Sequence, residues 1–261
     1  MRLTNLAEVA HYQHIYFSPH LDDAVLSCGG AILKQRHAGE HVLVITLCTA
    51  APSPEGPFNE LAQEFHRFWA LPPDQVVAAR LQEDAEAMDR LGADFVWADF
   101  SDAIYRRPDA YTTRESLFGT PIADDPLLDD LVAYIGDLRK RTPQAAIYAP
   151  LGVGFHVDHQ ITHRATLQTG EHGLIFYEDF PYAAHAGAVE ARRSSLDRQF
   201  SPHLEPIASV LEQKINAIAA YASQLDELFR ERSMAETVGA YHAAVGGTGS
   251  AAERTWLLAT E

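Results

Sequence analysis

A histidine and two adjacent aspartates follow a short apolar run near the start of the chain. The segment Ser18–Asp23 reads Ser-Pro-His-Leu-Asp-Asp and comes directly after residues 14–17, His-Ile-Tyr-Phe. Open α/β sheets bind their ligands at the carboxyl ends of strands, so side chains here are well placed for chemistry. His20 and Asp23 could bind one cation, which would leave Asp22 free to take a proton from water. The pattern predicts a metal site with a spare base.

A second cluster, residues 156–159 (His-Val-Asp-His), supplies what the first one lacks. It offers another imidazole ligand and a general acid, because a carboxylate such as Asp158 could hold His156 as an imidazolium. Catalytic zinc usually has three protein ligands and one open position for water. A His–Asp–His ligand set would keep a net charge of about +1, which lowers the pKa of a bound water and polarises a substrate carbonyl.

Each cluster also has a purely structural explanation. Asp22 or Asp23 could simply cap the helix that follows, and histidines three positions apart are common on helix surfaces. Either motif alone is weak evidence for catalysis. Together, each after a predicted strand and before a predicted helix, they favour a metal site.

The elements around the clusters predict an α/β fold. A strand over 15–18, a helix over 24–37 and a β-branched strand over 42–47 form a βαβ unit, which predicts a parallel sheet. We expect further strands over 94–100, 145–149 and 174–177, a last edge strand over 255–258, and helices over 58–70, 76–91, 127–141, 158–169 and 207–232. We expect a single domain over residues 1–261, with both clusters at one edge of its sheet.

Two other segments call for a specific interpretation. Residues 101–125 contain little periodicity and many turn formers, and a loop of this length is often functional, so we expect a lid or a substrate wall. Gly29 and Gly30 lie inside the predicted 24–37 helix and lack the lysine and hydroxyl residue of a phosphate loop. We expect this glycine pair to allow close packing of the helix.

The composition excludes several classes of partner. The chain has 261 residues and a formal net charge of −16, and such an excess of carboxylates repels nucleic acid and anionic membranes. Cys28 and Cys48 are the only cysteines and are expected to be buried free thiols. No signal-peptide pattern is visible, and the longest apolar run is too short to span a bilayer. We therefore expect a cytoplasmic protein with no nucleic-acid or membrane partner.

Several motifs together resemble the LmbE-like, or PIG-L, deacetylase family. The resemblance rests on Pro19–Asp23 with Gly29-Gly30, His156–His159, Arg80-x-x-Glu83 with Leu91-Gly92, Tyr177-Glu178-Asp179-x-Pro181-Tyr182, and Lys214 followed by Tyr221-x-Ser223-Gln224. These motifs occur in order over nearly the whole chain. Leu21 and Val157 stand where the family usually has proline, and Ala24 stands where many members have glutamate. None of these departures removes a ligand or the base.

The resemblance implies a Rossmann-like three-layer sandwich with a mostly parallel central sheet, the LmbE-like fold. It also implies a zinc-dependent hydrolase that removes acyl groups from amino sugars, such as N-acetylglucosamine, or from their conjugates. The ligands of one Zn2+ per chain, with Fe2+ as the alternative ion, would be His20, Asp23 and His159. Asp22 would be the general base, His156 the electrostatic or acid partner, and Asp158 would orient one of the histidines.

Three further residues can be interpreted in more than one way. Arg80 could bind substrate hydroxyls or phosphate, or it could pair with Asp84 one turn along its helix. Asp179 could hold a ligand imidazole in place, as metal sites commonly require, or act as a turn residue. His163 lies four residues after His159 and is expected to be structural, because three ligands are already supplied.

We expect an enzyme that de-N-acetylates a sugar-containing small molecule, a hydrolase of amide bonds other than peptide bonds. In one alternative the same site hydrolyses an ester or a phosphoester, although phosphoester hydrolysis often uses two metals. In another, the chain is a metal-stabilised binding protein without turnover, although a structural zinc site closes its coordination with four ligands. A homo-oligomer is compatible with the sequence.

Overall fold

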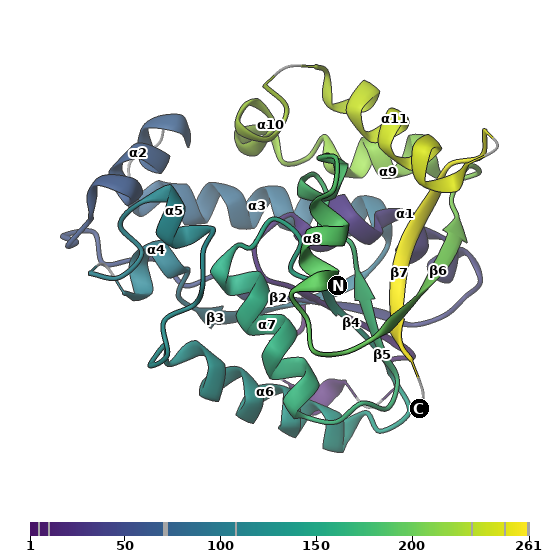
Figure 1. The fold of residues 1–261 in the computed structure, drawn as a ribbon, viewed down its shortest axis with the longest axis horizontal. Coiled ribbons are helices and arrows are strands. Elements are labelled where there is room, and N and C mark those ends of the chain that lie inside the picture. The colour runs from purple at the N-terminus through teal and green to yellow at the C-terminus, as the bar shows by residue number, and fades with distance from the viewer. Residues whose placement is uncertain are drawn as a thin grey trace.

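The apolar runs of the sequence form the strands of one sheet. The structure is a computed structural model that describes residues 1–4, 6–9, 11–69, 73–107, 109–230, 232–247 and 249–259. The strands are β1 (His14–Ser18), β2 (Val42–Cys48), β3 (Asp94–Phe100), β4 (Ala146–Pro150), β5 (Leu174–Tyr177), β6 (Phe200–Pro206) and β7 (Ala252–Leu258). Their order is β3-β2-β1-β4-β5-β7-β6 (Figure 1). Strands β1 to β5 run parallel, and β7 pairs antiparallel with both β5 and β6, so the sheet is mostly parallel as predicted.

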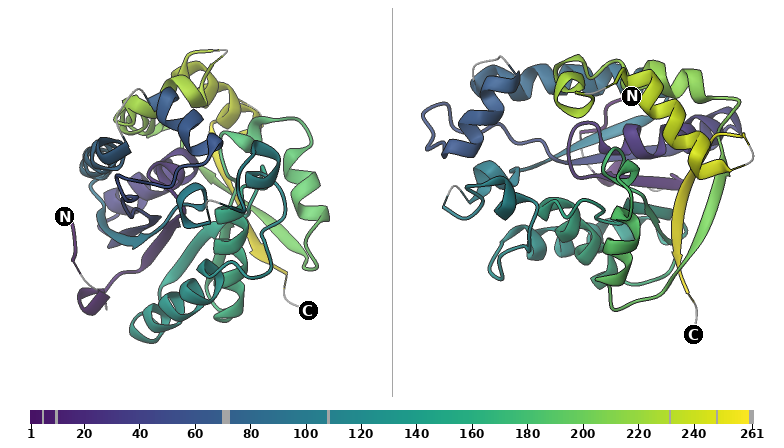
Figure 2. Two further views of the ribbon diagram at one scale, coloured as in Figure 1. Left: turned by 90° about the vertical axis from the view of Figure 1, so that its left-hand side faces the viewer. Right: turned by 45° about the horizontal axis from the view of Figure 1, so that its top comes forward.

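Helices cover both faces of this sheet (Figure 2). One layer contains α1 (Asp23–His37), α3 (Pro73–Leu91), α9 (Leu211–Ile218) and α11 (Met234–Gly246), and the other contains α6 (Leu127–Arg141), α7 (Val157–Gln168) and α8 (Ala188–Ser194). Successive strand residues point to opposite faces, so Tyr16 packs in the first layer while Ile15 and Phe17 pack in the second. The predicted three-layer sandwich is confirmed.

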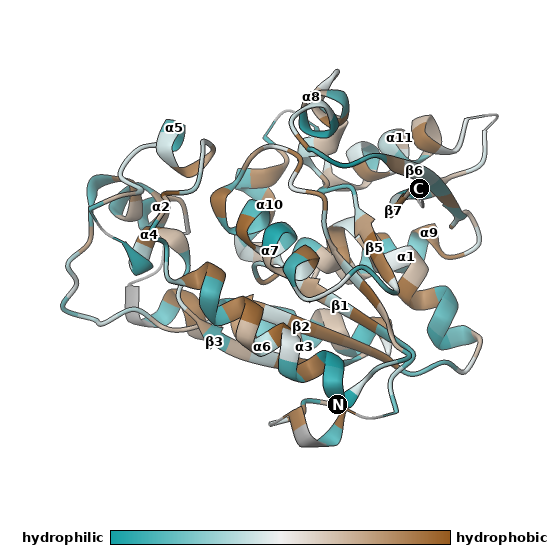
Figure 3. Cartoon of the chain, turned by 60° about the horizontal axis from the view of Figure 1, so that its bottom comes forward, coloured by the Kyte–Doolittle hydropathy of each residue, from teal (hydrophilic) through white to brown (hydrophobic). Residues whose placement is uncertain are grey.

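The central strands are buried on both sides. Every residue of β2 is buried, and hydrophobic colour follows β1 and β2 in Figure 3. A strand covered by helices on both faces needs no alternation of apolar and polar residues, which explains the unbroken run over 42–48. Cys28 and Cys48 are buried free thiols, as predicted. Among the described helices, none is long and apolar enough to cross a membrane.

The strand order reverses direction between β1 and β4. From β1 the chain continues to β2 and β3 on one side, whereas β4 pairs with β1 on its other side. Such a reversal leaves a crevice at the carboxyl ends of the two strands. The two sequence clusters follow β1 and β4, so the topology brings them to this crevice.

The prediction of a last edge strand at 255–258 is wrong. The strand β7 begins three residues earlier, at Ala252, and lies inside the sheet between β5 and β6. The edge strand on this side of the sheet is β6, which the sequence pattern did not predict. Most of its residues are exposed, and it contains Pro202 and Pro206. Proline is tolerated in edge strands because it cannot donate to a ladder, and here it hid the strand signal.

The prediction of one helix over 207–232 is also wrong, and part of that range, residue 231, lies outside the described residues. Two shorter helices, α9 and α10 (Ala222–Leu228), replace it. The carboxylate of Glu83 accepts hydrogen bonds from the backbone N–H and the hydroxyl of Ser223, both at the start of α10. This contact from α3 starts a new helix at Ala222, although the apolar periodicity of the sequence continues through this point.

Short helices occupy the ends of the strands beyond the sheet. The helix predicted over 58–70 is α2 (Glu60–Trp69), and its predicted last residue, Ala70, lies outside the described residues. The segment 101–125 contains α4 (Ala103–Arg106) and α5 (Arg114–Leu117), which its lack of periodicity did not predict. In Figure 1, α2, α4 and α5 extend past the strand ends on the left.

A buried ion pair connects three elements behind the crevice. The amino group of Lys214 in α9 lies 2.7 Å from Glu253 in β7, and both side chains are buried. The Glu253 carboxylate also accepts hydrogen bonds from the backbone N–H groups of Gly30 and Ala31 in α1. A Cβ atom on Gly30 would lie 2.6 Å from Ile207, so the close packing predicted for the glycine pair is confirmed.

Replacing Lys214 by methionine is expected to lower the free energy of unfolding by about 3–5 kcal/mol, because it leaves the Glu253 charge buried and unpaired. Urea titration monitored by circular dichroism measures this change. The control is Lys34→Met, which removes the partly exposed pair with Glu205 and should cost about 1 kcal/mol or less. Equal losses for the two variants would contradict the special role of the buried pair.

Candidate metal centre and active site

The crevice between β1 and β4 brings His20, Asp23 and His159 together. Nδ1 of His20 lies 3.3 Å from Nε2 of His159. Oδ2 of Asp23 lies 3.3 Å from each of these two nitrogens. The three atoms therefore form a nearly equilateral triangle, although His159 is more than 130 positions away from His20 and Asp23 in sequence.

The size of this triangle fits a divalent cation. Ligand atoms placed 2.0–2.1 Å from zinc at tetrahedral angles lie about 3.3–3.4 Å apart, as these three atoms do. His156 also brings a ring nitrogen within 4.8 Å of those of His20 and His159. Burial opposes a positive charge on His159, yet Asp23 and Asp179 raise its pKa to about 9. The carboxylates that stabilise this proton would also stabilise a bound metal ion.

Asp179 fixes the orientation of the His159 ring. Nδ1–H of His159 donates to Oδ1 of Asp179 at 2.7 Å, which turns the lone pair of Nε2 toward the triangle. The other carboxylate oxygen accepts from the backbone N–H groups of Gly152 and Val153, each at 2.8 Å. Of the two interpretations of Asp179, the contact with a ligand imidazole is the one that the geometry supports.

Asp158 makes the corresponding contact with His20. Nε2 of His20 lies 3.1 Å from Oδ2 of Asp158, which is completely buried. The same carboxylate accepts from the backbone N–H of Ala103 at 3.0 Å and from the guanidinium of Arg106 at 2.7 Å. Burial opposes its charge, but Arg106 and the hydrogen bond to His20 hold the pKa of Asp158 below its usual range.

Asp22 stands at the start of α1 without capping it. The structure gives its side chain no capping hydrogen bond, and the backbone N–H of Ala24 instead donates to the hydroxyl of Ser18. Burial and the neighbouring charge of Asp23 raise the pKa of Asp22 to about 7. Asp22 lines a pocket instead, so the interpretation of this side chain as a simple helix cap is wrong.

Arg80 faces Asp22 across the same pocket. Its Nη2 lies 3.8 Å from Oδ2 of Asp22, which is longer than a hydrogen bond. The carboxylate of Asp84, the alternative partner, accepts hydrogen bonds from Trp97 and Tyr221. Arg80 lines the pocket, as a residue that binds substrate would.

The environment of His156 differs from the one predicted. Its Nδ1 accepts a hydrogen bond from the backbone N–H of Asp158 at 3.2 Å, while the Asp158 carboxylate faces His20 and Arg106. Burial and the nearby His20 lower the pKa of His156 well below its usual value. The prediction of an imidazolium held by Asp158 is therefore wrong. His156 is a neutral imidazole whose Nε2–H is available as a donor.

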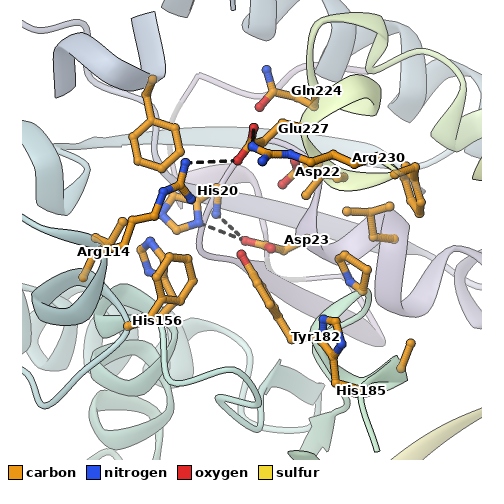
Figure 4. A pocket seen from close by; sticks show the side chains of 18 of the residues that line it. His20, Asp22, Asp23, Arg114, His156, Tyr182, His185, Gln224, Glu227 and Arg230 are labelled. Carbon is orange, nitrogen blue, oxygen red and sulfur yellow. Dashed lines mark hydrogen bonds and ion pairs between the residues drawn. The ribbon is translucent and has the colours of Figure 1, made fainter. Parts of the chain in front are cut away.

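The triangle opens into a cavity of about 460 Å³ (Figure 4). The segment 101–125 contributes part of the cavity wall, including Asp102, Leu117 and Phe118. Further lining residues that the sequence analysis did not propose as site residues are Arg114, Tyr182, Gln224, Glu227 and Arg230. Of these, Tyr182 and Gln224 are the last residues of two motifs on which the family resemblance rests. The sequence therefore carried a signal for these two residues. The predicted structural role of His163 agrees with its burial and its hydrogen bond to the carbonyl oxygen of Pro150.

Known proteins are similar to this chain in sequence and in fold. Residues 15–169 match the family described as PIG-L: GlcNAc-PI de-N-acetylase. The chain is 28% identical to 2'-N-acetylparomamine deacetylase of Niallia circulans, over 95% of this chain and 91% of the relative. The enzyme of the same name from Streptomyces fradiae is 29% identical, over 93% of this chain and 88% of the relative.

Several solved structures that resemble this fold are also deacetylases. The zinc-inhibited form of the teicoplanin deacetylase Orf2 superposes with a TM-score of 0.78 at 26% identity, covering 95% of this chain and 98% of that one. A deacetylase–teicoplanin complex gives a TM-score of 0.78 at 27% identity, covering 95% and 99% of the two chains. The protein therefore belongs to the PIG-L family, and it is an N-deacetylase, a hydrolase of amide carbon–nitrogen bonds.

Proposed function

We propose that this N-deacetylase removes the acetyl group from an amino sugar in a small glycoconjugate. The observation that carries the proposal is the triangle of His20, Asp23 and His159, which opens into the cavity beside an Asp22 that takes no part in it. These three residues would hold one zinc ion, with ferrous iron as the alternative. When bound, the cation would polarise the acyl carbonyl and make water a better nucleophile.

Asp22 acts as the general base in this proposal. A water molecule attacks the amide carbon, its oxygen forms the new C–O bond, and its proton passes to the Asp22 carboxylate. The electron pair of the carbonyl double bond moves onto the acyl oxygen. When the C–N bond then breaks, its electron pair goes to nitrogen, which takes the proton back from Asp22. The electron pair on the acyl oxygen re-forms the carbonyl bond, so acetic acid and a free amine leave, and the acid then ionises to acetate.

His156 stabilises the negative charge on the acyl oxygen. Its Nε2–H is a donor because Nδ1 already accepts from the backbone N–H of Asp158. A fixed donor at this point is worth most when the charge has developed, so its effect falls on the rate rather than on substrate binding. His156 performs this role as a neutral group.

The cavity suits a sugar with part of its conjugate. Its volume of about 460 Å³ lies in the range of small-molecule sites, which is about 300–1,000 Å³. The named relatives act on acetylated paromamine and in teicoplanin biosynthesis, which supports a small glycosidic substrate. We propose N-acetylglucosamine as the sugar, in keeping with the family description. The free thiols of Cys28 and Cys48 support a cytoplasmic location.

The proposal is tested first by direct assay. Zinc-loaded protein is incubated with N-acetylglucosamine, simple glycosides of it and 2'-N-acetylparomamine, and the free amine is measured by chromatography after labelling. Release of amine and acetate in equal amounts is the expected result. Zinc binding without amine release from any of these compounds would contradict it.

His159→Ala is expected to weaken zinc binding by at least about 100-fold, because it removes one of three proposed ligands. Competition with a chromogenic chelator measures the dissociation constant. His163→Gln, on the same helix but directed to Pro150, should leave zinc affinity unchanged within about threefold. Tight zinc binding by His159→Ala would show that the ion is held elsewhere.

Arg106→Met is expected to weaken zinc binding by about 10–100-fold, because Asp158 loses the partner that holds it against His20. The neighbouring Arg107, which pairs with Asp109 and Asp124 at the surface, supplies the matched control as Arg107→Met. Unchanged zinc affinity in both variants would separate Arg106 from the metal centre.

Asp22→Asn is expected to bind zinc normally and to lose activity by about 100- to 10,000-fold, because the amide cannot accept the proton of water. The measured quantities are zinc content and kcat. The exposed Asp89 in α3 gives a control, Asp89→Asn, that should keep full activity. Turnover of Asp22→Asn near that of the unmodified protein would show that another group is the base.

A further inference from the structure

The hydroxyl group of Tyr182 lies inside the catalytic cavity. Tyr182 follows β5 by five residues and begins a short 3-10 helix, Tyr182–Ala184. Its side chain lines the cavity, and Figure 4 shows its hydroxyl oxygen directed toward the carboxylate of Asp23. The reaction proposed for Asp22 and His156 does not use this side chain.

This hydroxyl has no hydrogen-bond partner among the described residues. The hydroxyls of five other tyrosines all donate to the protein, namely Tyr16 to Gln35, Tyr111 to Asp125, Tyr177 to Phe17, Tyr221 to Asp84 and Tyr241 to Glu178. A tyrosine hydroxyl removed from bulk solvent usually finds a partner. The buried hydroxyl of Tyr134 is also unpaired, but Tyr134 does not line the cavity. At Tyr182 the open side is the cavity, where a bound group can accept this hydrogen bond.

The ring that carries the hydroxyl is held rigidly. It packs directly on Gly154, where a Cβ atom would lie 2.6 Å from the Cγ of Tyr182. Its centroid is 5.8 Å from that of Phe118 and 6.1 Å from that of His159, the latter edge-on at 83°. A donor fixed in this way needs no reorganisation when charge appears beside it.

The hydroxyl also keeps its proton. Burial and the charges of Asp23 and Asp22 raise the pKa of Tyr182 well above its usual value. A tyrosine hydroxyl, with an ordinary pKa of about 10, is in any case a neutral donor at neutral pH. It can offer a hydrogen bond without taking part in proton transfer.

We propose that Tyr182 is a second donor to the acyl oxygen in the tetrahedral intermediate, together with His156. The ring of Phe118 packs on both of these rings, with its centroid 5.2 Å from that of His156 and 5.8 Å from that of Tyr182. The two donors therefore line one side of the cavity. In Figure 4, Asp22 lies on the other side of Asp23 from both of them. Water activated by Asp22 would thus push the carbonyl electron pair toward His156 and Tyr182.

This inference rests on the proposed deacetylation, and its chemistry adds one interaction to it. When the new C–O bond forms, the carbonyl electron pair becomes a negative charge on the acyl oxygen. The Tyr182 O–H donates to that oxygen and keeps its proton throughout. The hydrogen bond weakens again when the C–N bond breaks and the carbonyl re-forms. Such a contact lowers the barrier without tightening the binding of substrate.

The test is Tyr182→Phe, which removes only the hydroxyl and retains the ring packed on Gly154. The expected kcat is about 100- to 1,000-fold lower, with KM changed by about threefold at most. Zinc affinity should equal that of the unmodified protein. The control is Tyr105→Phe, because the Tyr105 hydroxyl bonds to His66 and Tyr105 has no part in the proposed reaction.

Two further measurements separate catalysis from folding. Incorporation of 4-aminophenylalanine at position 182 restores an N–H donor at nearly the same place and should recover most of kcat. A phosphonamidate analogue of the tetrahedral intermediate should lose affinity for Tyr182→Phe by the same factor as kcat/KM, while the affinity of the product amine stays constant.

The failure of this inference differs from a failure of the proposed function. If the unmodified protein releases amine and Tyr182→Phe does so at the same kcat, the role of Tyr182 is overturned and the deacetylase stands. A rise in KM alone would overturn it too, since Tyr182 would then only bind substrate. If the unmodified protein releases no amine from any acetylated sugar, the proposed function itself falls.

Discussion

The site depends first on the parallel pairing of β1 with β4. Their register, His14 with Ala146 and Tyr16 with Tyr148, sets the carboxyl ends of both strands side by side. Each strand is followed at once by a tight segment that carries one half of the donor set. Because a register slip would turn side chains to the opposite face, the apolar pattern that fixes this pairing also fixes the distance between His20 and His159. The hydrophobic core and the chemistry are therefore determined by the same residues.

Around these two strands, each carboxylate that orients a histidine ring is compensated by its own hydrogen-bond donors. His159 is supported by Asp179, whose second oxygen is satisfied by two backbone amides, whereas His20 is supported by Asp158, whose second oxygen is satisfied by Arg106. Arg106 in turn makes two hydrogen bonds to Asp125. Isolated charges in an interior are costly, so each carboxylate that orients a ring needs a donor of its own. Among the described residues, Asp22 has no such donor at hydrogen-bond distance, and its contact with Arg80 is 3.8 Å long, which leaves it able to exchange a proton.

The sequence predicted those parts of the structure that depend on local residue patterns. Strand β2 could be predicted because burial on both faces restricts its residue types. The two halves of the donor set could be predicted because metal binding requires particular residue types at short spacing. The break between α9 and α10 was not accessible, since it depends on Glu83 from a different helix. The neutral state of His156 was missed for the same reason, because the direction of the Asp158 carboxylate is set by Arg106. Edge strand β6 lacked any apolar signal.

The clasp between Arg106 and Asp125 closes the intervening wall segment into a loop whose two ends meet. The base of this loop, at Arg106, contacts the Asp158 carboxylate that faces His20, and Phe118 further along it packs on His156 and Tyr182. Its tip, which includes Arg114 and Leu117, lines the cavity without supplying an atom of the triangle, and closing a longer loop adds little entropic cost. Within such an architecture, residues at this tip can change the shape of the cavity while His20, Asp23 and His159 are retained. Redesign of substrate range would accordingly begin at this tip.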